Sequence, residues 1–306
     1  MSKRMERVVH SIGIPRALGH YLYPKLWETF FSEMGMKVVL SPPTSRRIIE
    51  QAGLISEAEH CLPFKLFDAH VAELVGKVDM IFVPRILSMR KNHLSCPKLS
   101  VLPDNTRAQY GEEVRVLSTD IDIRKTPLTE SMAHLGRLLN VDKALVRTAI
   151  ECALEVLNRE AGTTISLNEK ATLRFLVISH PYNLYDPYLS DMILNTLAAQ
   201  GVGVDTLSFD RQDMEPKPLV WDMCSVMYEG LKQLDPKTCA GVVEISSFNC
   251  GCDSVAGYLF RELLNEKKIP CMTLVLDEHA GQAGIETRLE AFVDSIKEQR
   301  DAITRH

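Results

Sequence analysis

A strand–helix–strand pattern that occurs twice constrains the fold of this chain more than any other feature. In the first copy, residues 7–14 predict a strand that ends at Pro15, and residues 37–40 predict another strand just after Gly35. The spacing of apolar residues between Pro15 and Gly35 predicts one helix there. A strand, a helix and a second strand in this order form the βαβ unit of a parallel sheet covered by helices.

The second copy begins at residue 173 and has the same order. Residues 173–179 predict a strand that runs into His180, residues 187–200 predict a helix, and residues 202–205 predict the next strand. Each copy is followed by a later predicted strand, at residues 78–84 and 241–245. We therefore expect an α/β protein with two tandem Rossmann-like, or flavodoxin-like, parallel-sheet domains. Ligands of such sheets bind beyond the carboxyl ends of the strands, so the cleft between the domains is the expected site.

The segment between the two copies is predicted to be helical, because its apolar residues recur at helical spacing and turn signals are few. The length of 306 residues is enough for two domains of about 150 residues each. We expect an N-terminal domain over residues 1–126, a helical connector over 127–164 and a C-terminal domain over 165–306.

Composition and charge exclude several classes of partner. The formal net charge of -5 gives no basic surplus that would neutralise the phosphates of nucleic acid or bind anionic lipid. No apolar stretch approaches the roughly 20 residues of a membrane helix, and the N-terminal residues lack the pattern of a signal peptide. We therefore expect a cytoplasmic protein without nucleic-acid or membrane partners.

Eight cysteines in a chain expected in the cytoplasm favour metal or redox chemistry, because disulfides rarely persist there. Four of them lie in loops at predicted strand-to-helix transitions, namely Cys61, Cys96, Cys250 and Cys252. A doubly wound sheet brings such loops to one edge, and the positive end of a following helix favours a thiolate. No Cys-x-x-Cys pair is present, so the spacing alone also fits incidental buried thiols. The other four cysteines are expected in the core: Cys152, Cys224, Cys239 and Cys271.

Several short motifs occur in a defined order along the chain. They are residues 12–18 (IGIPRAL), 40–46 (LSPPTSR), 59–65 (EHCLPFK), 96–98 (CPK), 181–186 (PYNLYD), 277–281 (DEHAG) and 287–292 (TRLEAF). Together they resemble the acyl-CoA dehydratase activase-related proteins. These belong with the 2-hydroxyacyl-CoA dehydratases, the benzoyl-CoA reductases and the double-cubane-cluster proteins. The resemblance covers nearly the whole chain.

The resemblance implies a 4Fe-4S cluster held between two Rossmann-like domains by Cys61, Cys96 and Cys250. It also implies a partner, an ATP-dependent iron-sulfur activator of the actin/sugar-kinase fold, that supplies low-potential electrons. The family pattern Phe-x-Cys-Gly-Pro-Asp-Ser has a proline where this chain has Cys252. Cys252 is therefore a fourth ligand, a substitute for Cys250 or a bystander. Three thiolates would leave one iron open to substrate, whereas four would favour electron transfer alone.

Polar residues near the expected cleft are candidates for catalysis, although the catalytic residue stays unknown. Arg16, Lys65 and Lys98 would offset the negative charge of a thiolate-bound cluster, or they are solvated surface charges. His180 would donate a proton or bond a cluster sulfide, or it is a structural hydrogen-bonding group. The segment 277–279 (Asp-Glu-His) is expected to be a loop that caps the last helix rather than a metal site.

The expected function is that of an iron-sulfur redox protein. It would accept electrons from the activator for a reduction or a radical elimination on a small molecule or an acyl-CoA. The alternatives are a non-catalytic electron-relay or docking subunit, and a structural zinc protein on the same cysteines. No phosphate-binding glycine motif is present, so ATP use is assigned to the partner. A homodimer would bring two clusters close to each other.

Overall fold

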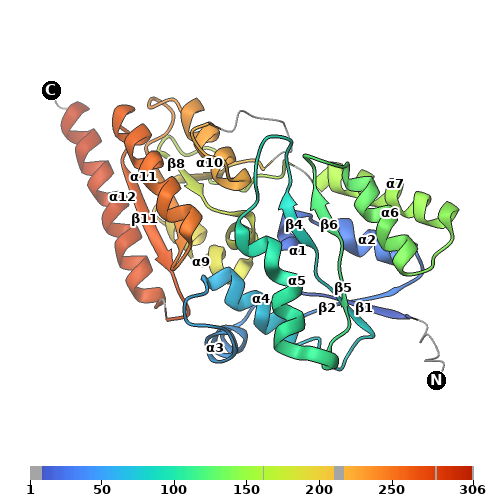
Figure 1. Ribbon diagram of the computed structural model, residues 1–306. Coiled ribbons are helices and arrows are strands. Elements are labelled where there is room, and N and C mark those ends of the chain that lie inside the picture. The colour runs from blue at the N-terminus through green and yellow to red at the C-terminus, as the bar shows by residue number, and fades with distance from the viewer. Residues whose placement is uncertain (1–8, 161, 210–216, 280, 305–306) are drawn as a thin grey trace, which may run out of the picture.

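The structure is a computed structural model that describes residues 9–160, 162–209, 217–279 and 281–304. It is a mixed α/β protein in which two largely parallel sheets are flanked by helices (Figure 1). We call residues 9–126, with the first sheet, the first half, and residues 165–304, with the second sheet, the second half.

The first sheet has the strand order β2-β1-β3-β5, and its strands are all parallel. They are β1 (Ser11–Ile14), β2 (Lys37–Leu40), β3 (Met80–Phe82) and β5 (Val116–Leu117). Two more strands follow β3 and β5 and pair in parallel with each other, β4 (Arg85–Ser88) and β6 (Asp120–Asp122). The strands predicted within 7–14, 37–40 and 78–84 are thus present, and residues 7 and 8 lie outside the described residues.

The single helix predicted for residues 15–35 is two helices, α1 (Gly19–Leu22) and α2 (Leu26–Glu33). Pro24 lies between them, and Lys25 has a left-handed backbone with φ 56°. A proline has no N–H to donate and disfavours helical geometry in the residue before it. The prediction of one continuous helix was wrong for this reason.

The second sheet has the order β11-β10-β8-β9-β7. Its strands are β7 (Ser166–Leu167), β8 (Arg174–Ile178), β9 (Gly203–Thr206), β10 (Gly241–Ser247) and β11 (Cys271–Leu276). Only the edge strand β7 is antiparallel. When the parallel strands of each half are numbered along the chain, both sheets have the order 2-1-3-4. In each sheet the strand order therefore reverses between the first and third strands, where ligands bind in open α/β sheets.

The predicted connector consists of the helices α6 (Leu128–Leu138) and α7 (Lys143–Glu160). α7 packs along α2, and apolar residues of both connector helices lie in the core of the first half. The helices of the second half are α8 (Pro181–Leu184), α9 (Pro187–Ala199), α10 (Asp222–Gln233), α11 (Gly251–Glu266) and α12 (Gln282–Thr304).

Two helices of the first half pack on the core of the second half. Ile48 and Ala52 of α3 (Arg46–Ile55) and Leu66 of α4 (Leu62–Ala72) join residues of α9 and β8 in one apolar cluster. Ten of the 11 residues of α4 are buried, so this helix is enclosed by both halves (Figure 1). The two halves therefore share a core. The remaining helices are α5 (Pro97–Tyr110) and the short 3-10 helix at Gly111–Glu113.

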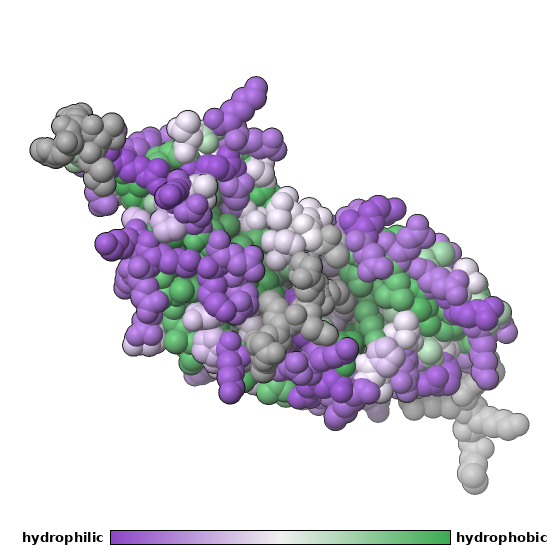
Figure 2. Space-filling model, turned by 90° about the horizontal axis from the view of Figure 1, so that it is seen from above, coloured by the Kyte–Doolittle hydropathy of each residue, from purple (hydrophilic) through white to green (hydrophobic). Residues whose placement is uncertain are grey.

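The surface differs between the second half and the connector. Seen from above, hydrophilic residues cover much of the second half, whereas hydrophobic residues are exposed over α6 and α7 (Figure 2). Leu138 of α6 and Leu145 of α7 are among the exposed apolar side chains. Among the described residues, no helix has the length and apolar character needed to span a membrane.

Candidate metal centre

Three of the predicted ligand cysteines occupy the same position at the start of a helix. Cys61 is the N-cap of α4, Cys96 is the N-cap of α5, and Cys250 is the N-cap of α11. In α4 and α5 a proline lies in the first helical turn, where its missing N–H costs no hydrogen bond. The partial positive charge of a helix N-terminus stabilises a thiolate, so each of the three positions favours a deprotonated sulfur.

The fold brings these thiols together with Cys252. Cys250 and Cys252 are buried in one apolar cluster, and the half-buried Cys61 and Cys96 pack against it. Cys61 lies near enough to Cys250 and Cys96 for their charges to raise the pKa of its thiol. The cluster lies at the carboxyl ends of β4 and β10, where the two halves meet.

The metal-free thiols differ in how readily they lose a proton. Burial raises the pKa of Cys61 to about 11, and Lys98 acts against this shift. The neighbouring Cys252 thiol lowers the pKa of Cys96 to about 6, and the same contact, together with burial, raises the pKa of Cys252. The two thiols therefore do not lose their protons independently, and Cys96 loses its proton more readily than Cys252.

A buried His180–Asp253 pair adjoins the thiols. His180 Nε2 is 2.7 Å from Asp253 Oδ1, and the Ser246 hydroxyl donates to the other carboxylate oxygen at 3.0 Å. Burial opposes charge on His180, but the Asp253 carboxylate raises the pKa of His180 well above its ordinary value. Ligand atoms of His180, Asp253 and Cys224 lie within 4.8 Å of one another.

Sequence reasoning missed two members of this group. Asp253 follows Cys250 by three residues in the first turn of α11, so its spacing carried a signal. Cys224 lies on α10. The apolar residues of this segment recur at helical spacing, which predicted only that Cys224 is a core residue. It is fully buried as expected, but beside His180.

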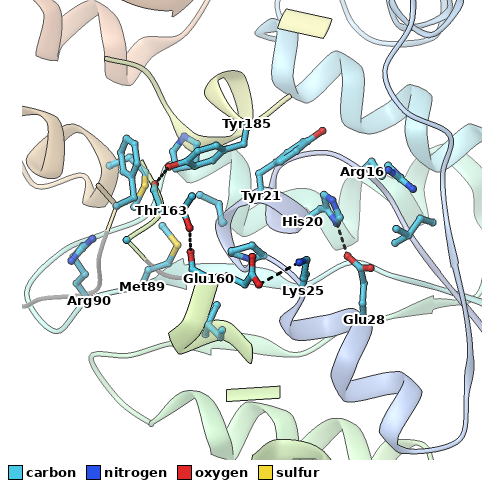
Figure 3. Close-up of a pocket in the computed structure, with 18 residues that line it drawn as sticks. Arg16, His20, Tyr21, Lys25, Glu28, Met89, Arg90, Glu160, Thr163 and Tyr185 are labelled. Atoms are coloured by element: carbon cyan, nitrogen blue, oxygen red, sulfur yellow. Dashed lines mark hydrogen bonds and ion pairs between the residues drawn. The ribbon is translucent and has the colours of Figure 1, made fainter. Parts of the chain in front are cut away.

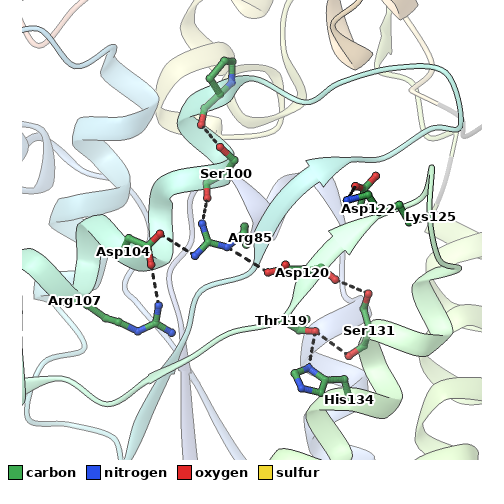
Figure 4. A network of polar contacts seen from close by, with 11 residues as sticks. Arg85, Ser100, Asp104, Arg107, Thr119, Asp120, Asp122, Lys125, Ser131 and His134 are labelled. Atoms are coloured by element: carbon green, nitrogen blue, oxygen red, sulfur yellow. Dashed lines mark hydrogen bonds and ion pairs between the residues drawn. The ribbon is translucent and has the colours of Figure 1, made fainter.

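The loop that carries Cys96 is held from both halves. Asp222, the first residue of α10, accepts hydrogen bonds from the Ser95 hydroxyl at 2.7 Å and from the backbone N–H of Met89 at 3.1 Å. On the other side, Arg85 of β4 donates to Asp104 of α5 at 2.8 Å and pairs with Asp120 of β6 at 3.2 Å (Figure 4). These contacts fix the direction of α5 and so the position of its N-cap thiol.

Residues 11–209 match the family model described as CoA enzyme activase uncharacterised domain (DUF2229). The chain belongs to this family. The match includes Cys61, Cys96 and His180, whereas Cys250, Cys252 and Asp253 follow it along the chain. No curated protein matches the sequence.

In this CoA enzyme activase family member, the predicted catalytic candidates do not lie together. Lys65 is 4% exposed, and its Nζ is 2.6 Å from Glu278 Oε1, so it is a buried ion pair and not a surface charge. Lys98 is the cation beside the thiols, and it lies 5.9 Å from the centre of the Phe64 ring. Arg16 lies in a separate cavity.

The 277–279 segment is a loop before α12, as expected for a structural role. Glu278 forms an ion pair with Lys65, and Asp277 accepts a hydrogen bond from the backbone N–H of His279 at 2.8 Å. Ala280 of the same motif lies outside the described residues.

The donor set of the thiol cluster fits an iron-sulfur cluster. Thiolate sulfurs are the ligands of such clusters, and three of these sulfurs sit at helix N-termini that favour negative charge. Thiolate sulfurs are also ligands of zinc, so the same residue types are compatible with a zinc site.

Proposed function

We propose that this CoA enzyme activase family protein holds a 4Fe-4S cluster on Cys61, Cys96 and Cys250. One observation carries the proposal: three helices from different parts of the chain begin at cysteines whose thiols meet in one half-buried cluster. Buried thiols that serve only to fill the core would not be expected to occupy the N-cap position of three helices. The aligned helix ends and Lys98 would offset the negative charge of a thiolate-bound cluster.

We further propose that Cys252 is a hydrogen-bond donor to the Cys96 sulfur and not a ligand. Its thiol lies near the Cys96 sulfur and lowers the pKa of Cys96. Hydrogen bonds to ligand sulfurs raise the reduction potential of iron-sulfur clusters. Three ligands would leave one iron open, so a bound cluster would supply one-electron transfer and a Lewis-acidic position.

In the same proposal, an ATP-dependent iron-sulfur activator delivers low-potential electrons to this site in the cytoplasm. The protein would use them for a reduction or a radical elimination on a small molecule or an acyl-CoA. The family match supports a role in the activation of CoA enzymes in general. His180 would act as the proton-holding group beside the site, with Asp253 fixing its ring through the 2.7 Å hydrogen bond.

The test is anaerobic purification followed by iron, sulfide and zinc analysis and by electron paramagnetic resonance of the dithionite-reduced protein. We expect about four irons and four sulfides per chain. Cys61→Ala, Cys96→Ala and Cys250→Ala should each lose them, and Cys252→Ala should keep them with a shifted potential. Cys152→Ala is the matched control, since Cys152 lies on α7 away from the cluster of thiols.

Three results would overturn parts of the proposal. Zinc in place of iron would identify a structural site, and a chain without metal after reconstitution would leave only buried thiols. Loss of iron in Cys252→Ala would make Cys252 a fourth ligand and favour an electron relay over an enzyme.

A further inference from the structure

A cavity of about 520 Å³ lies between the halves, next to the thiol cluster but separate from it. Its walls come from the loop after β1, from α1 and α2, from the end of α7 and from the loop after β8 (Figure 3). None of the cysteines lines it. Pro181 and Met223 do, and each is the sequence neighbour of a residue at the thiol site, His180 and Cys224.

Arg16 places a cation with one unsatisfied donor in this cavity, and its charge acts against the burial that raises the pKa of the Glu28 carboxyl. The backbone N–H of Arg16 donates to the Ser41 hydroxyl at 2.8 Å. By contrast, its side-chain Nε is buried and has no hydrogen-bond partner among the described residues, and its guanidinium forms no ion pair with them. A buried donor without a partner is costly, and more so when it is charged. An anionic ligand would remove this cost.

Two other pairs of ionisable groups in the cavity contact each other. Lys25 Nζ pairs with Glu160 at 3.3 Å, and His20 lies 3.5 Å from Glu28. Burial, with a contribution from Arg16, lowers the pKa of His20 to about 4, so its ring is neutral at pH 7. Figure 3 shows Arg16 at one end of the cavity, with its guanidinium away from the Lys25–Glu160 pair.

Arg90 is a further cation that lines the cavity, and much of the remaining wall is apolar. The apolar part is formed by Leu22, Leu40, Met89, Leu157, Phe209 and Met223. A ligand that fills the cavity must therefore present a charged group at one end and hydrocarbon along its body. A planar guanidinium matches a carboxylate through two parallel hydrogen bonds.

We propose that this cavity binds a small organic monocarboxylate whose carboxylate pairs with Arg16 and whose hydrocarbon body packs on the apolar wall. The ligand would lie beside Pro181 and Met223, the sequence neighbours of His180 and Cys224. Its role as substrate rests on the proposed function, whereas its binding does not.

The test is isothermal titration calorimetry of the full chain, metal-free and with reduced thiols, using hexanoate as the probe. Hexanoate should bind, and hexanamide, which has the same shape without charge, should bind about ten- to a hundredfold more weakly. Arg16→Met should weaken hexanoate binding by a similar factor, and Arg16→Lys by less. Arg46→Met is the control, because Arg46 is exposed on α3 and should leave the Kd unchanged.

Equal binding of hexanoate and hexanamide would overturn the role of the charge, and unchanged binding in Arg16→Met would overturn the role of Arg16. If inorganic phosphate binds more tightly than hexanoate, the proposal of a carboxylate ligand is wrong and the site is one for phosphate. Cys61→Ala separates the two proposals: hexanoate binding should survive in this variant even where metal binding is lost.

Discussion

Buried polar side chains join the two halves residue by residue. His70 of α4 is fully buried, and its ring nitrogens lie 2.8 Å from the Ser41 hydroxyl and 3.1 Å from the Thr44 hydroxyl. Thr44 in turn donates to Asp186, the N-cap of α9 in the second half. This chain of buried hydroxyls, imidazole and carboxylate crosses the boundary between the halves.

The burial of His70 predicts acid sensitivity. Burial, assisted by the charges of His20 and Arg16, lowers the pKa of His70 from 6.5 to about 4. As the pH falls from 6.5 towards 4, the unfolded chain therefore takes up a proton that the folded chain does not, and stability is lost. We expect His70 to account for a loss of up to about 2 kcal/mol between pH 6.5 and 5.

Urea unfolding at the two pH values measures this loss. His70→Gln should show a smaller pH dependence than the wild type, whereas His279→Gln, at an exposed position, should show the same dependence. An unchanged slope in His70→Gln would contradict the assignment. Burial raises the pKa of Asp68 to about 6, so Asp68 contributes to the pH dependence of stability with the opposite sign. This contribution is the same in every variant, and the comparison between variants therefore removes it.

Asp222 is the second residue on which the contact between the halves depends. Asp222→Ala leaves two buried donors, the Ser95 hydroxyl and the Met89 N–H, without their acceptor. We expect a loss of about 2–4 kcal/mol in the free energy of unfolding, measured with urea. Glu229→Ala, on the same helix but in a solvent-exposed pair with Lys232, should cost less than about 0.5 kcal/mol. Equal losses in the two variants would show that Asp222 does not hold this loop.

Two glycines show how the packing of helices differs between elements. Gly136 of α6 faces Val146 of α7, and a Cβ at this position would overlap the valine side chain. Gly53 of α3 has room, because the nearest atom to an added Cβ is Glu278 Cγ at 3.6 Å. The close approach of α6 and α7 therefore depends on a missing side chain, and that of α3 does not.

We expect opposite signs for the same substitution in these helices. Gly136→Ala should destabilise the protein by about 1–3 kcal/mol through overpacking, in excess of its gain in helix propensity. Gly53→Ala should stabilise it by about 0.5–1 kcal/mol, since alanine is the better helix former. Thermal and urea unfolding of both variants measure these changes in stability. If Gly136→Ala stabilises the protein, α6 and α7 can move apart to accommodate the added methyl group.

The core shared by the two halves bears on how the whole molecule unfolds. α3 and α4 belong to the first half in sequence, but their apolar residues pack with the second sheet. The two tryptophans report on the halves separately, because Trp27 lies in the core of the first half and Trp221 precedes α10 in the second.

We expect both halves to unfold in a single transition. Leu66→Ala, which removes a buried side chain of α4, should cost about 2–5 kcal/mol and lower the midpoint of both halves together. Tryptophan fluorescence of Trp27→Phe and of Trp221→Phe, each compared with circular dichroism of the same variant, measures this. Two separate midpoints would show that the halves are independent domains.

Much of the local structure was determined by the sequence alone. The strands at 37–40 and 173–179 and the helices that begin after Cys61 and Cys96 follow from apolar periodicity and from prolines at the first helical turn. Such signals depend on residues a few positions apart, so they can be read along the chain. The break between α1 and α2 was also encoded, by Pro24, and was missed because the apolar spacing continues across it.

Tertiary structure alone decided which residues meet. Lys65 pairs with Glu278, 213 positions away, and Cys224 lies beside His180 although its helix reads as ordinary core. The packing of α3 and α4 on the second sheet was equally absent from the predicted domains. The physical reason is the same in each case. Burial and charge pairing depend on which surfaces of the helices and strands pack together, and the periodicity of apolar residues along the chain does not specify which other element an element packs against.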